Sequence, residues 1–320
     1  MEQITNKRIA ITGAFGFIGA NVIKYLNQLG YFDIDAYETH NWQKKWQNTI
    51  GLKYNEFVYT DINRLLRISD LYDVIIHLSA NSSTKAEANE ENWKTNYLDT
   101  ISLIQNLSPN TRLIFASSAS TFGMEENDFT ERVEGLNPIC FYAYTKWKCD
   151  EFILKSNKPN VYGLKFFNVY GSALERYKGG MSSVIYRWLT QDIREDSPIE
   201  LFKSLRPEYK DGHQARDFVT VWDICSIIHH CMITENKGGL FNAGSGSPKT
   251  WLKVAGIVLD VRGLNKDWIK FVDMPLSLKD QYQYFTCSNN TRLREELGYK
   301  KNFLSLEEGI HRTWDEINSK

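Results

Sequence analysis

The sequence has no block of one charge sign and no long apolar run. Its 38 Lys and Arg residues nearly balance 39 Asp and Glu residues, which leaves a net charge of −1. A protein whose main partner is nucleic acid or an anionic membrane normally carries a basic patch, and a membrane-spanning helix needs about 20 apolar residues. We therefore expect neither nucleic acid nor membrane as a partner.

Cysteine is scarce and irregularly spaced. The five cysteines are odd in number and include no Cys-x-x-Cys, so neither a disulfide framework nor a zinc ribbon is predicted. Cys225 and His229 share a helical face, but we favour a mostly buried helix there over a metal site. Lys7 and Arg8 lead straight into a strand and not into a secretory signal, which favours a cytoplasmic protein.

Proline-rich linkers, low-complexity segments and internal repeats are also absent. The 320 residues, 42% apolar and 24% charged, have an ordinary globular composition and can form one large core or two unequal lobes. Because no linker separates them, two lobes would be fused through a shared core.

Three glycines near the start of the chain mark a candidate cofactor site. Gly13, Gly16 and Gly19 follow an apolar strand predicted over 9–12 and precede an amphipathic helix. Strand, glycine turn and helix form a dinucleotide-binding fingerprint, because the glycines permit a tight turn, close approach of the pyrophosphate and close helix packing. The intervening residues predicted to join this site are Phe15, Phe17 and Ile18.

The predicted second strand, 34–37, ends at Glu38. An acidic side chain there can accept hydrogen bonds from the adenosine ribose of NAD and would repel the 2′-phosphate of NADP. Lys44 and Lys45 follow soon after and could neutralise that phosphate. The choice between NAD and NADP is open at this point.

Another strand, predicted to start at residue 73, runs into Leu78, Ser79 and Ala80, with Ser82 just beyond. Small polar residues at the end of such a strand can line the pocket where cofactor and substrate meet, although a turn with a helix cap is the alternative. Asn96, in the next predicted helix, is expected to face the sheet near the cofactor.

Tyr142 and Lys146 are the central pair of the sequence. Their spacing of four places them on one helical face, where an ammonium beside a phenol would lower the phenol's pKa toward the range of a working base. Upstream, the strand 113–118 ends in Ser117 and Ser118, at the position where open α/β sheets bind ligands.

The predicted fold is α/β, a Rossmann doubly wound parallel sheet with a smaller α/β substrate-binding domain. Regular alternation of strands and helices stops near Gly171. We assign 1–170, with 215–235 returning to it, to the dinucleotide-binding domain. The ranges assigned to the substrate-binding domain are 171–214 and 236–320.

Two cationic residues beyond Gly171 have open interpretations. Lys178 precedes two glycines and is either a solvated loop charge or a functional group. Arg216 can bind a phosphate in a bidentate manner or form an ion pair with Asp217 or another acidic residue.

The glycines with Ser118, Tyr142 and Lys146 resemble the extended short-chain dehydrogenases that act on nucleotide sugars. Further motifs resemble the ADP-L-glycero-D-manno-heptose 6-epimerase family across nearly the whole chain. They lie at residues 45–52, 167–171, 177–184, 201–204, 209–212, 216–218 and 282–286.

This resemblance implies roles for individual residues. Ser118 would hold the substrate oxygen, Tyr142 would be one acid/base group, and Lys146 would tune it and bind the nicotinamide ribose. Lys178 would be the second acid/base group, on the other side of the sugar. The residues implied to bind the substrate nucleotide and its neighbouring groups are Asn168, Met181, Phe202, Arg216 and Tyr282.

The implied reaction inverts C6 of a nucleotide-activated heptose by transient oxidation and reduction with a tightly bound nicotinamide cofactor, for surface polysaccharide synthesis. Another NAD(P)-dependent 4-epimerase, dehydrogenase or reductase is the alternative, and an inactive cofactor sensor is an alternative of another class. A dehydratase is disfavoured, because Ala119 and Ser120 replace the acid pair expected after the serine. We also expect a homo-oligomer.

Several positions depart from the family pattern. Thr60 stands where a lysine is expected near the cofactor phosphate, and Lys85 and Ala86 replace a hydroxyl and an acid. Trp222 and the run 287–289 differ as well. These departures keep the coenzyme, the nucleotide and the exact sugar open.

Overall fold

The computed structural model describes residues 6–38, 42–59, 62–83, 87–234, 237–279 and 282–319, except for the side chain of Ser277. Thr60, Lys85 and Ala86, whose departures were noted above, lie outside these ranges. The strands are β1 (Ile9–Thr12), β2 (Ile34–Glu38), β3 (Glu56–Tyr59), β4 (Val74–His77), β5 (Arg112–Ser118), β6 (Val161–Phe166), β7 (Asn168–Tyr170), β8 (Ile199–Phe202), β9 (Ala215–Arg216), β10 (Phe218–Thr220), β11 (Gly239–Ala243), β12 (Lys249–Thr250) and β13 (Ile269–Val272).

The α-helices are α1 (Phe17–Gln28), α2 (Ile62–Arg67), α3 (Glu90–Trp93), α4 (Asp99–Asn106), α5 (Phe141–Ser156), α6 (Val184–Thr190), α7 (Val221–Ile233), α8 (Trp251–Val261), α9 (Thr291–Glu295) and α10 (Leu306–Asn318). A π-helical turn, η4 (Lys94–Leu98), joins α3 to α4. The 3₁₀ segments are η1 (Trp42–Lys44), η2 (Trp46–Thr49), η3 (Ser69–Leu71), η5 (Ala119–Phe122), η6 (Ala173–Met181) and η7 (Leu276–Leu278).

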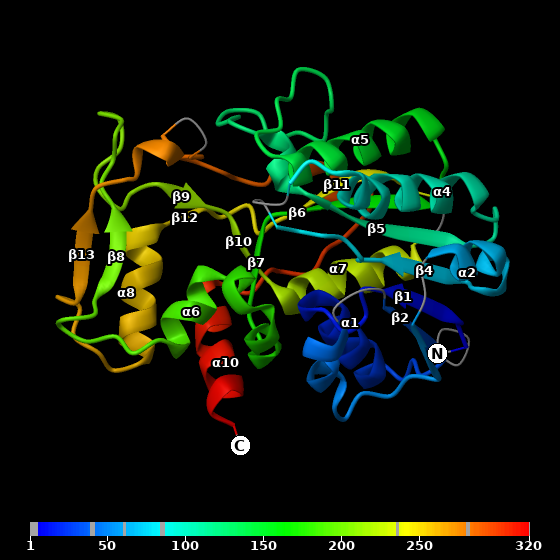
Figure 1. Ribbon diagram of the computed structural model, residues 1–320, viewed down its shortest axis with the longest axis horizontal. Coiled ribbons are helices and arrows are strands. Elements are labelled where there is room, and N and C mark those ends of the chain that lie inside the picture. Colours follow the sequence, from blue (N-terminus) through cyan, green and yellow to red (C-terminus); the bar gives the residue numbers. More distant parts are fainter. Residues whose placement is uncertain are drawn as a thin grey trace.

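A seven-stranded parallel sheet organises the larger part of the molecule (Figure 1). Its strand order is β11-β6-β5-β4-β1-β2-β3, and every neighbouring pair is parallel. The strand order reverses between β1 and β4. Doubly wound sheets bind their ligands at such a switch point, beyond the carboxyl ends of the strands. This is the predicted Rossmann fold.

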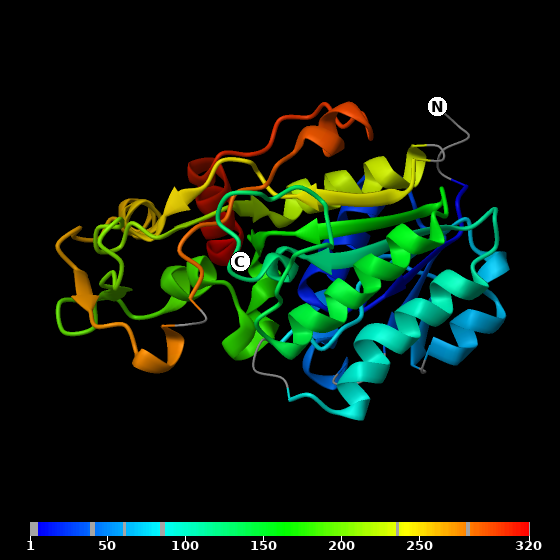
Figure 2. The same cartoon turned by 90° about the horizontal axis from the view of Figure 1, so that it is seen from above.

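Helices cover both faces of the sheet (Figure 2). Side chains alternate along each strand, so Ile9 and Ile11 of β1 join one apolar core and Ala10 joins the other. Helices α1 and α7 pack on the first face, whereas α2, α4 and α5 pack on the second. Both faces are buried, which explains why the strands are continuous apolar runs.

A smaller lobe contains α6, α8, α10 and the parallel pair β8–β13, which share a third apolar core. It lies at the left of Figure 1. The predicted domain limits differ from the sheet topology at residues 239–243. Residues 239–243, assigned to the substrate-binding domain, form β11 and pair with β6 in the central sheet. Because that pairing joins strands far apart in sequence, local pattern could not reveal it.

Candidate active site

A cavity of about 740 Å³ opens at the carboxyl ends of the central strands. Most of the predicted site residues line it, although they come from distant parts of the chain. These are Gly13, Gly16, Phe17, Ile18, Gly19, Glu38, Lys45, Leu78, Ser79, Ala80, Ser82, Ser118, Tyr142, Lys146, Asn168, Lys178 and Met181. The predicted residues that do not line it are Phe15, Asn96, Phe202, Arg216 and Tyr282.

The glycine turn forms a close-fitting cradle below the cavity. Gly13 has a φ of 67°, which favours glycine. A Cβ on Gly19 would lie 2.2 Å from the carbonyl oxygen of Gly13, so only glycine lets α1 begin this close to the turn. The exposed backbone N–H groups at the start of a helix attract phosphate. This geometry fits the pyrophosphate of a dinucleotide.

Glu38, at the end of β2, lies beside the glycine turn. Its Oε1 accepts a hydrogen bond of 2.7 Å from the backbone N–H of Phe15. Phe15 does not line the cavity, and its ring stacks on Phe57 at 4.7 Å between centroids, so Phe15 supports the turn through its backbone. Asn48, which belongs to the motif at residues 45–52, donates to the Phe15 carbonyl and also lines the cavity.

Asn96 lies in a helical turn as predicted but does not line the cavity. It is buried in the π-helical turn η4, where Oδ1 accepts from the backbone N–H of Asn81 at 2.8 Å and Nδ2 donates to the Asn81 carbonyl at 3.1 Å. Asn81 also donates to Asn92, and both of these residues line the cavity. Asn96 therefore fixes the segment after β4, and it reaches the cavity only through Asn81.

Helix α5 supplies the central pair. Tyr142 and Lys146 lie one turn apart, with Nζ of Lys146 5.9 Å from the Tyr142 ring centroid and 4.3 Å from that of Phe115. Ser118 ends β5, and its Oγ accepts a hydrogen bond of 2.9 Å from Ser120, a contact that the sequence analysis missed. Ser118, Tyr142 and Lys146 therefore converge as their motifs predicted.

The protonation of this pair differs from the prediction. Burial raises the pKa of Tyr142 to about 12, a change that a hydrogen bond with Ser118 opposes. Burial lowers the pKa of Lys146 to about 8. Desolvation disfavours the charged form of each group and is the largest cause of both changes. The prediction of a lowered Tyr142 pKa is therefore wrong for the protein alone.

The Nζ of Lys146 is buried and has no hydrogen-bond partner among the described residues. Buried ammonium groups are normally hydrogen-bonded. A ribose diol is a suitable acceptor, so this orphaned donor, like the glycine cradle, fits a nicotinamide dinucleotide.

Lys178 reaches the same cavity from η6. Its Nζ lies 4.7 Å from the ring centroid of Phe17. Burial lowers the pKa of Lys178, while the nearby Glu175 opposes this change. The Glu175 carboxylate accepts hydrogen bonds from the backbone of Gly171 and from Ser183. Lys178 is therefore a partly desolvated amine held at the cavity and not a solvated loop charge.

Phe202, Arg216 and Tyr282 form a separate cluster. The Phe202 and Tyr282 rings are 5.9 Å apart, and the Arg216 guanidinium lies 5.3 Å from the Tyr282 ring. Arg216 donates to the carbonyls of Ala215 and Gln283, whereas Asp217 accepts from Ser245, Gly246 and Ser288. The proposed Arg216–Asp217 ion pair is therefore not formed.

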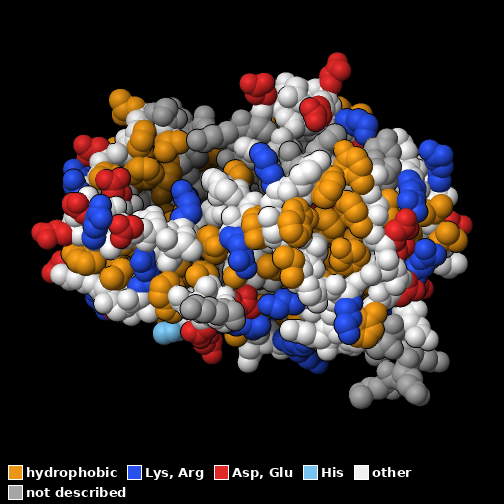
Figure 3. Space-filling view, turned by 60° about the horizontal axis from the view of Figure 1, so that its bottom comes forward, with side chains coloured by type: hydrophobic (Ala, Val, Ile, Leu, Met, Phe, Trp, Pro, Cys, Tyr) orange, Lys and Arg blue, Asp and Glu red, His pale blue; other side chains and the backbone are white. Residues whose placement is uncertain are grey.

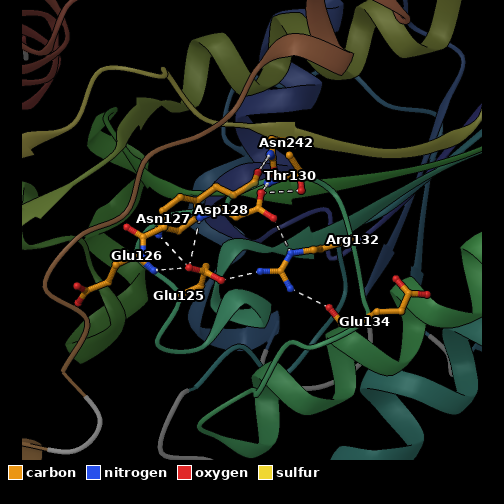
Figure 4. A network of polar contacts seen from close by, with 9 residues as sticks. Glu125, Glu126, Asn127, Asp128, Thr130, Arg132, Glu134 and Asn242 are labelled. Atoms are coloured by element: carbon orange, nitrogen blue, oxygen red, sulfur yellow. Dashed lines mark hydrogen bonds and ion pairs between the residues drawn. The ribbon is translucent and has the colours of Figure 1, made fainter.

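A loop beside α5 is held by a polar network (Figure 4). Glu125 accepts hydrogen bonds from the backbone of the next three residues, and Arg132 contacts both Glu125 and Asp128. Glu126, which follows Glu125 in the loop, forms an ion pair with Arg206 at 2.7 Å. The loop thereby connects the β5 end to the 203–214 segment.

Some lining residues carried no signal in the sequence. They are Glu91, Asn92, Thr95 and Trp251. They follow no spaced motif, and only the fold brings them together.

The described parts of the chain show a mixed surface charge and neither a membrane-spanning helix nor a metal-binding cluster. Lys and Arg side chains are interspersed with Asp and Glu on the face shown in Figure 3. Within the described residues, no helix is both long and apolar enough to cross a membrane. No group of three His, Cys, Asp or Glu residues within the described ranges could hold a metal ion.

The fold and the cavity define a dinucleotide-dependent α/β enzyme with a Ser, Tyr and Lys constellation. The chain matches the NAD dependent epimerase/dehydratase family over residues 9–244 and belongs to it. The family description agrees with the predicted nicotinamide cofactor.

Relatives span nearly the whole chain. ADP-L-glycero-D-manno-heptose-6-epimerase of Fusobacterium nucleatum is 32% identical, covering 94% of this chain and 95% of its own. The protein of the same name from Nitratidesulfovibrio vulgaris is also 32% identical, covering 94% of each chain. The crystal structure of the Helicobacter pylori ADP-L-glycero-D-manno-heptose-6-epimerase has a TM-score of 0.81 at 24% identity, covering 100% of this chain and 98% of that one.

Proposed function

We propose that the protein inverts C6 of a nucleotide-activated heptose and converts ADP-D-glycero-D-manno-heptose to ADP-L-glycero-D-manno-heptose for surface polysaccharide synthesis. One observation carries the proposal: Tyr142 of α5 and Lys178 of η6, two proton-transfer groups from different parts of the fold, line one cavity. The names of the Fusobacterium and Nitratidesulfovibrio relatives support it.

Inversion at a carbon that passes through a carbonyl needs proton transfer on both faces of the substrate. A bound nicotinamide would supply the acceptance and return of the hydride. Tyr142, beside Ser118, would move the hydroxyl proton on one face. Lys178, whose pKa burial lowers, would do so on the other, because desolvation increases the fraction of neutral amine that can accept a proton.

The remaining side chains would orient the substrate. Ser82, Asn168 and Met181 line the cavity near the two proton-transfer groups. The guanidinium of Arg216 is buried and forms no ion pair with a described acidic side chain. Its positive charge is therefore available to pair with a diphosphate. We propose that it binds the nucleotide diphosphate, with Tyr282 and Phe202 packed beside it.

We propose NAD as the bound coenzyme. Glu38 ends β2, lines the cavity and is fixed by the Phe15 N–H. A carboxylate there accepts hydrogen bonds from a ribose diol and repels a 2′-phosphate. Denaturing the purified protein and analysing the released nucleotide by mass spectrometry tests this, and recovery of NADP would contradict it even though Lys45 lies nearby.

We also propose that the chain forms a homo-oligomer. Trp93, Tyr97, Tyr144 and Trp147 make a row of contacting rings on α3, η4 and α5, and Tyr144 is 40% exposed. Light scattering of the purified protein tests this; a mass near 37.2 kDa would refute it.

The test of function is proton NMR of ADP-D-glycero-D-manno-heptose incubated with the protein and no added coenzyme. The C6 epimer is expected to appear, because the coenzyme is regenerated within each turnover. If nothing changes, other nucleotide heptoses are to be supplied with NAD and NADP. Net oxidation or reduction of the sugar would favour a dehydrogenase or reductase instead.

A further inference from the structure

A buried ion pair lies beneath the proposed catalytic residues. Nζ of Lys165 in β6 donates to Oδ2 of Asp150 in α5 at 2.6 Å, and both side chains are 0% exposed. Burying two charges costs free energy that their attraction offsets only in part, and apolar replacements of such pairs are often neutral or stabilising. Stability alone is therefore a weak explanation for this pair.

The pair contacts the element that carries Ser118. Nζ of Lys165 also donates to Oγ1 of Thr121 at 2.8 Å, and the Thr121 hydroxyl donates to the Ser118 carbonyl at 2.8 Å. A continuous chain of hydrogen bonds thus runs from Asp150 on α5 to the end of β5. Thr121 is fully buried, so no solvent competes for these contacts.

The pair also lies beside Lys146. Asp150 follows Lys146 by four residues on α5, so the two share a helical face. Burial lowers the pKa of Lys146, and the neighbouring Cys149 and Asp150 oppose this change. Neither Oδ1 of Asp150 nor Nζ of Lys146 has a hydrogen-bond partner among the described residues, so their interaction is through space.

We propose that Asp150 and Lys165 are positioning residues, which together set the charge of Lys146 and hold the Ser118 end of β5 against α5. The catalytic part of this inference rests on the proposed function. The electrostatic part concerns only groups of this chain, and it can be measured without substrate.

Other groups around Lys146 carry no charge at neutral pH. Tyr142 and Cys149 face it from α5, and His77 faces it from β4. Burial raises the pKa of Tyr142 and that of Cys149 to about 12 and lowers that of His77 to about 3. The ring of Phe115 on β5 completes the surroundings. Asp150, paired with Lys165, is therefore the anion that acts on Lys146.

Two single substitutions should change the pKa of Lys146 in opposite directions. Asp150→Asn removes a negative charge and leaves Lys165, so the charged form of Lys146 is disfavoured and its pKa falls. Lys165→Met leaves Asp150 without its partner cation, so the pKa of Lys146 rises. Shifts of about one pH unit are expected for each. The double variant removes both charges and should titrate near the wild-type value.

The measurement is a ¹³C NMR titration of the full-length protein, purified with its bound coenzyme and labelled at the lysine ε-carbons. Lys146 is recognised by its low pKa and by loss of the signal in Lys146→Met. Thr121→Val is the matched control, because it breaks the link to Ser118 and keeps the ion pair. It should leave the Lys146 titration unchanged and lower kcat about tenfold with little change in KM.

Different results would overturn the electrostatic role, the positioning role and the proposed function. Shifts in the same direction, or none in folded variants, would overturn the electrostatic role, and an unchanged kcat in Thr121→Val would overturn the positioning role. If Lys165→Met does not fold, Asp150→Asn and the double variant still differ in the charge of residue 165, and the double variant must then titrate higher. Absence of epimerase activity in the wild type would refute the proposed function while leaving the NMR result intact.

Discussion

Nζ of Lys178 lies 4.7 Å from the ring centroid of Phe17. Phe17 is the first residue of α1, directly after the glycine turn, and η6 packs on the same helix. A cation over an aromatic ring gains about 0.5–2 kcal/mol depending on its desolvation. The proposed second acid/base group is thus held against the cofactor-binding turn itself.

Lys178→Met should abolish epimerisation while leaving slow oxidation or reduction on one face. The thioether keeps the apolar contact with Phe17 but cannot transfer a proton. Product stereochemistry by proton NMR is the readout. Arg176→Met is the control, because Arg176 belongs to the same 3₁₀ segment, is exposed and does not itself line the cavity. Normal epimerisation by Lys178→Met would remove the two-base mechanism.

Tyr142→Phe should lower kcat by about 10³-fold and leave the free energy of unfolding nearly unchanged. Only one hydroxyl in a polar cavity is lost, whereas general acid/base catalysis contributes about 10²–10⁴-fold. Tyr144→Phe is a matched control, since Tyr144 lies on the same helix but is 40% exposed. Comparable turnover in the two variants would contradict the role of Tyr142.

Gly19→Ala should destabilise the protein by about 1–3 kcal/mol and reduce its coenzyme content, because the new Cβ would lie 2.2 Å from the Gly13 carbonyl oxygen. Gly256→Ala in α8 is the control. No heavy atom lies within 4 Å of its Cβ position, so this change should stabilise the helix by about 0.5–1 kcal/mol. Urea unfolding and absorbance of bound coenzyme give both readouts. Equal coenzyme content in the two variants would argue against the cradle.

His77 should make the wild type lose stability as pH falls. It lies buried between Thr12 and Thr100, and burial lowers its pKa to about 3. Between about pH 6.5 and 3 the unfolded chain binds a proton that the folded chain does not, so stability falls as pH decreases through this window.

His77→Asn removes this contribution. Between pH 7 and pH 5 the wild type should therefore lose about 2 kcal/mol more than the variant in urea unfolding. Parallel pH dependences would show that His77 is protonated in the folded state. Measuring the difference between the two proteins cancels the contributions of the carboxyl groups.

The features predicted correctly from the sequence are those with a short-range signature. The glycine turn, and Tyr142 with Lys146 on one helical face, follow from spacing alone, and the strand ending at Ser118 follows from an apolar run. The sequence could not give the pKa of Tyr142, because burial depends on the whole fold. Asn96 was predicted to be near the cofactor, and in the structure its side chain forms hydrogen bonds with the backbone of Asn81.

Long-range contacts account for the other differences. Arg216 and Tyr282 pair with each other across a large sequence separation and stay outside the cavity. Ser120 and Thr121 hold Ser118 through contacts that follow no motif. The position of β11 depends on its pairing with β6, which no local pattern encodes.

The place of β11 has a consequence for biosynthesis. β6 ends at Phe166, and its outer neighbour begins only at Gly239. While the intervening segment leaves the ribosome, β6 is an unprotected sheet edge, and such edges pair readily with strands of other chains. The nascent protein is therefore exposed to intermolecular strand pairing at β6 until residue 243 has emerged, after which β11 covers β6 and becomes the outer strand of the sheet.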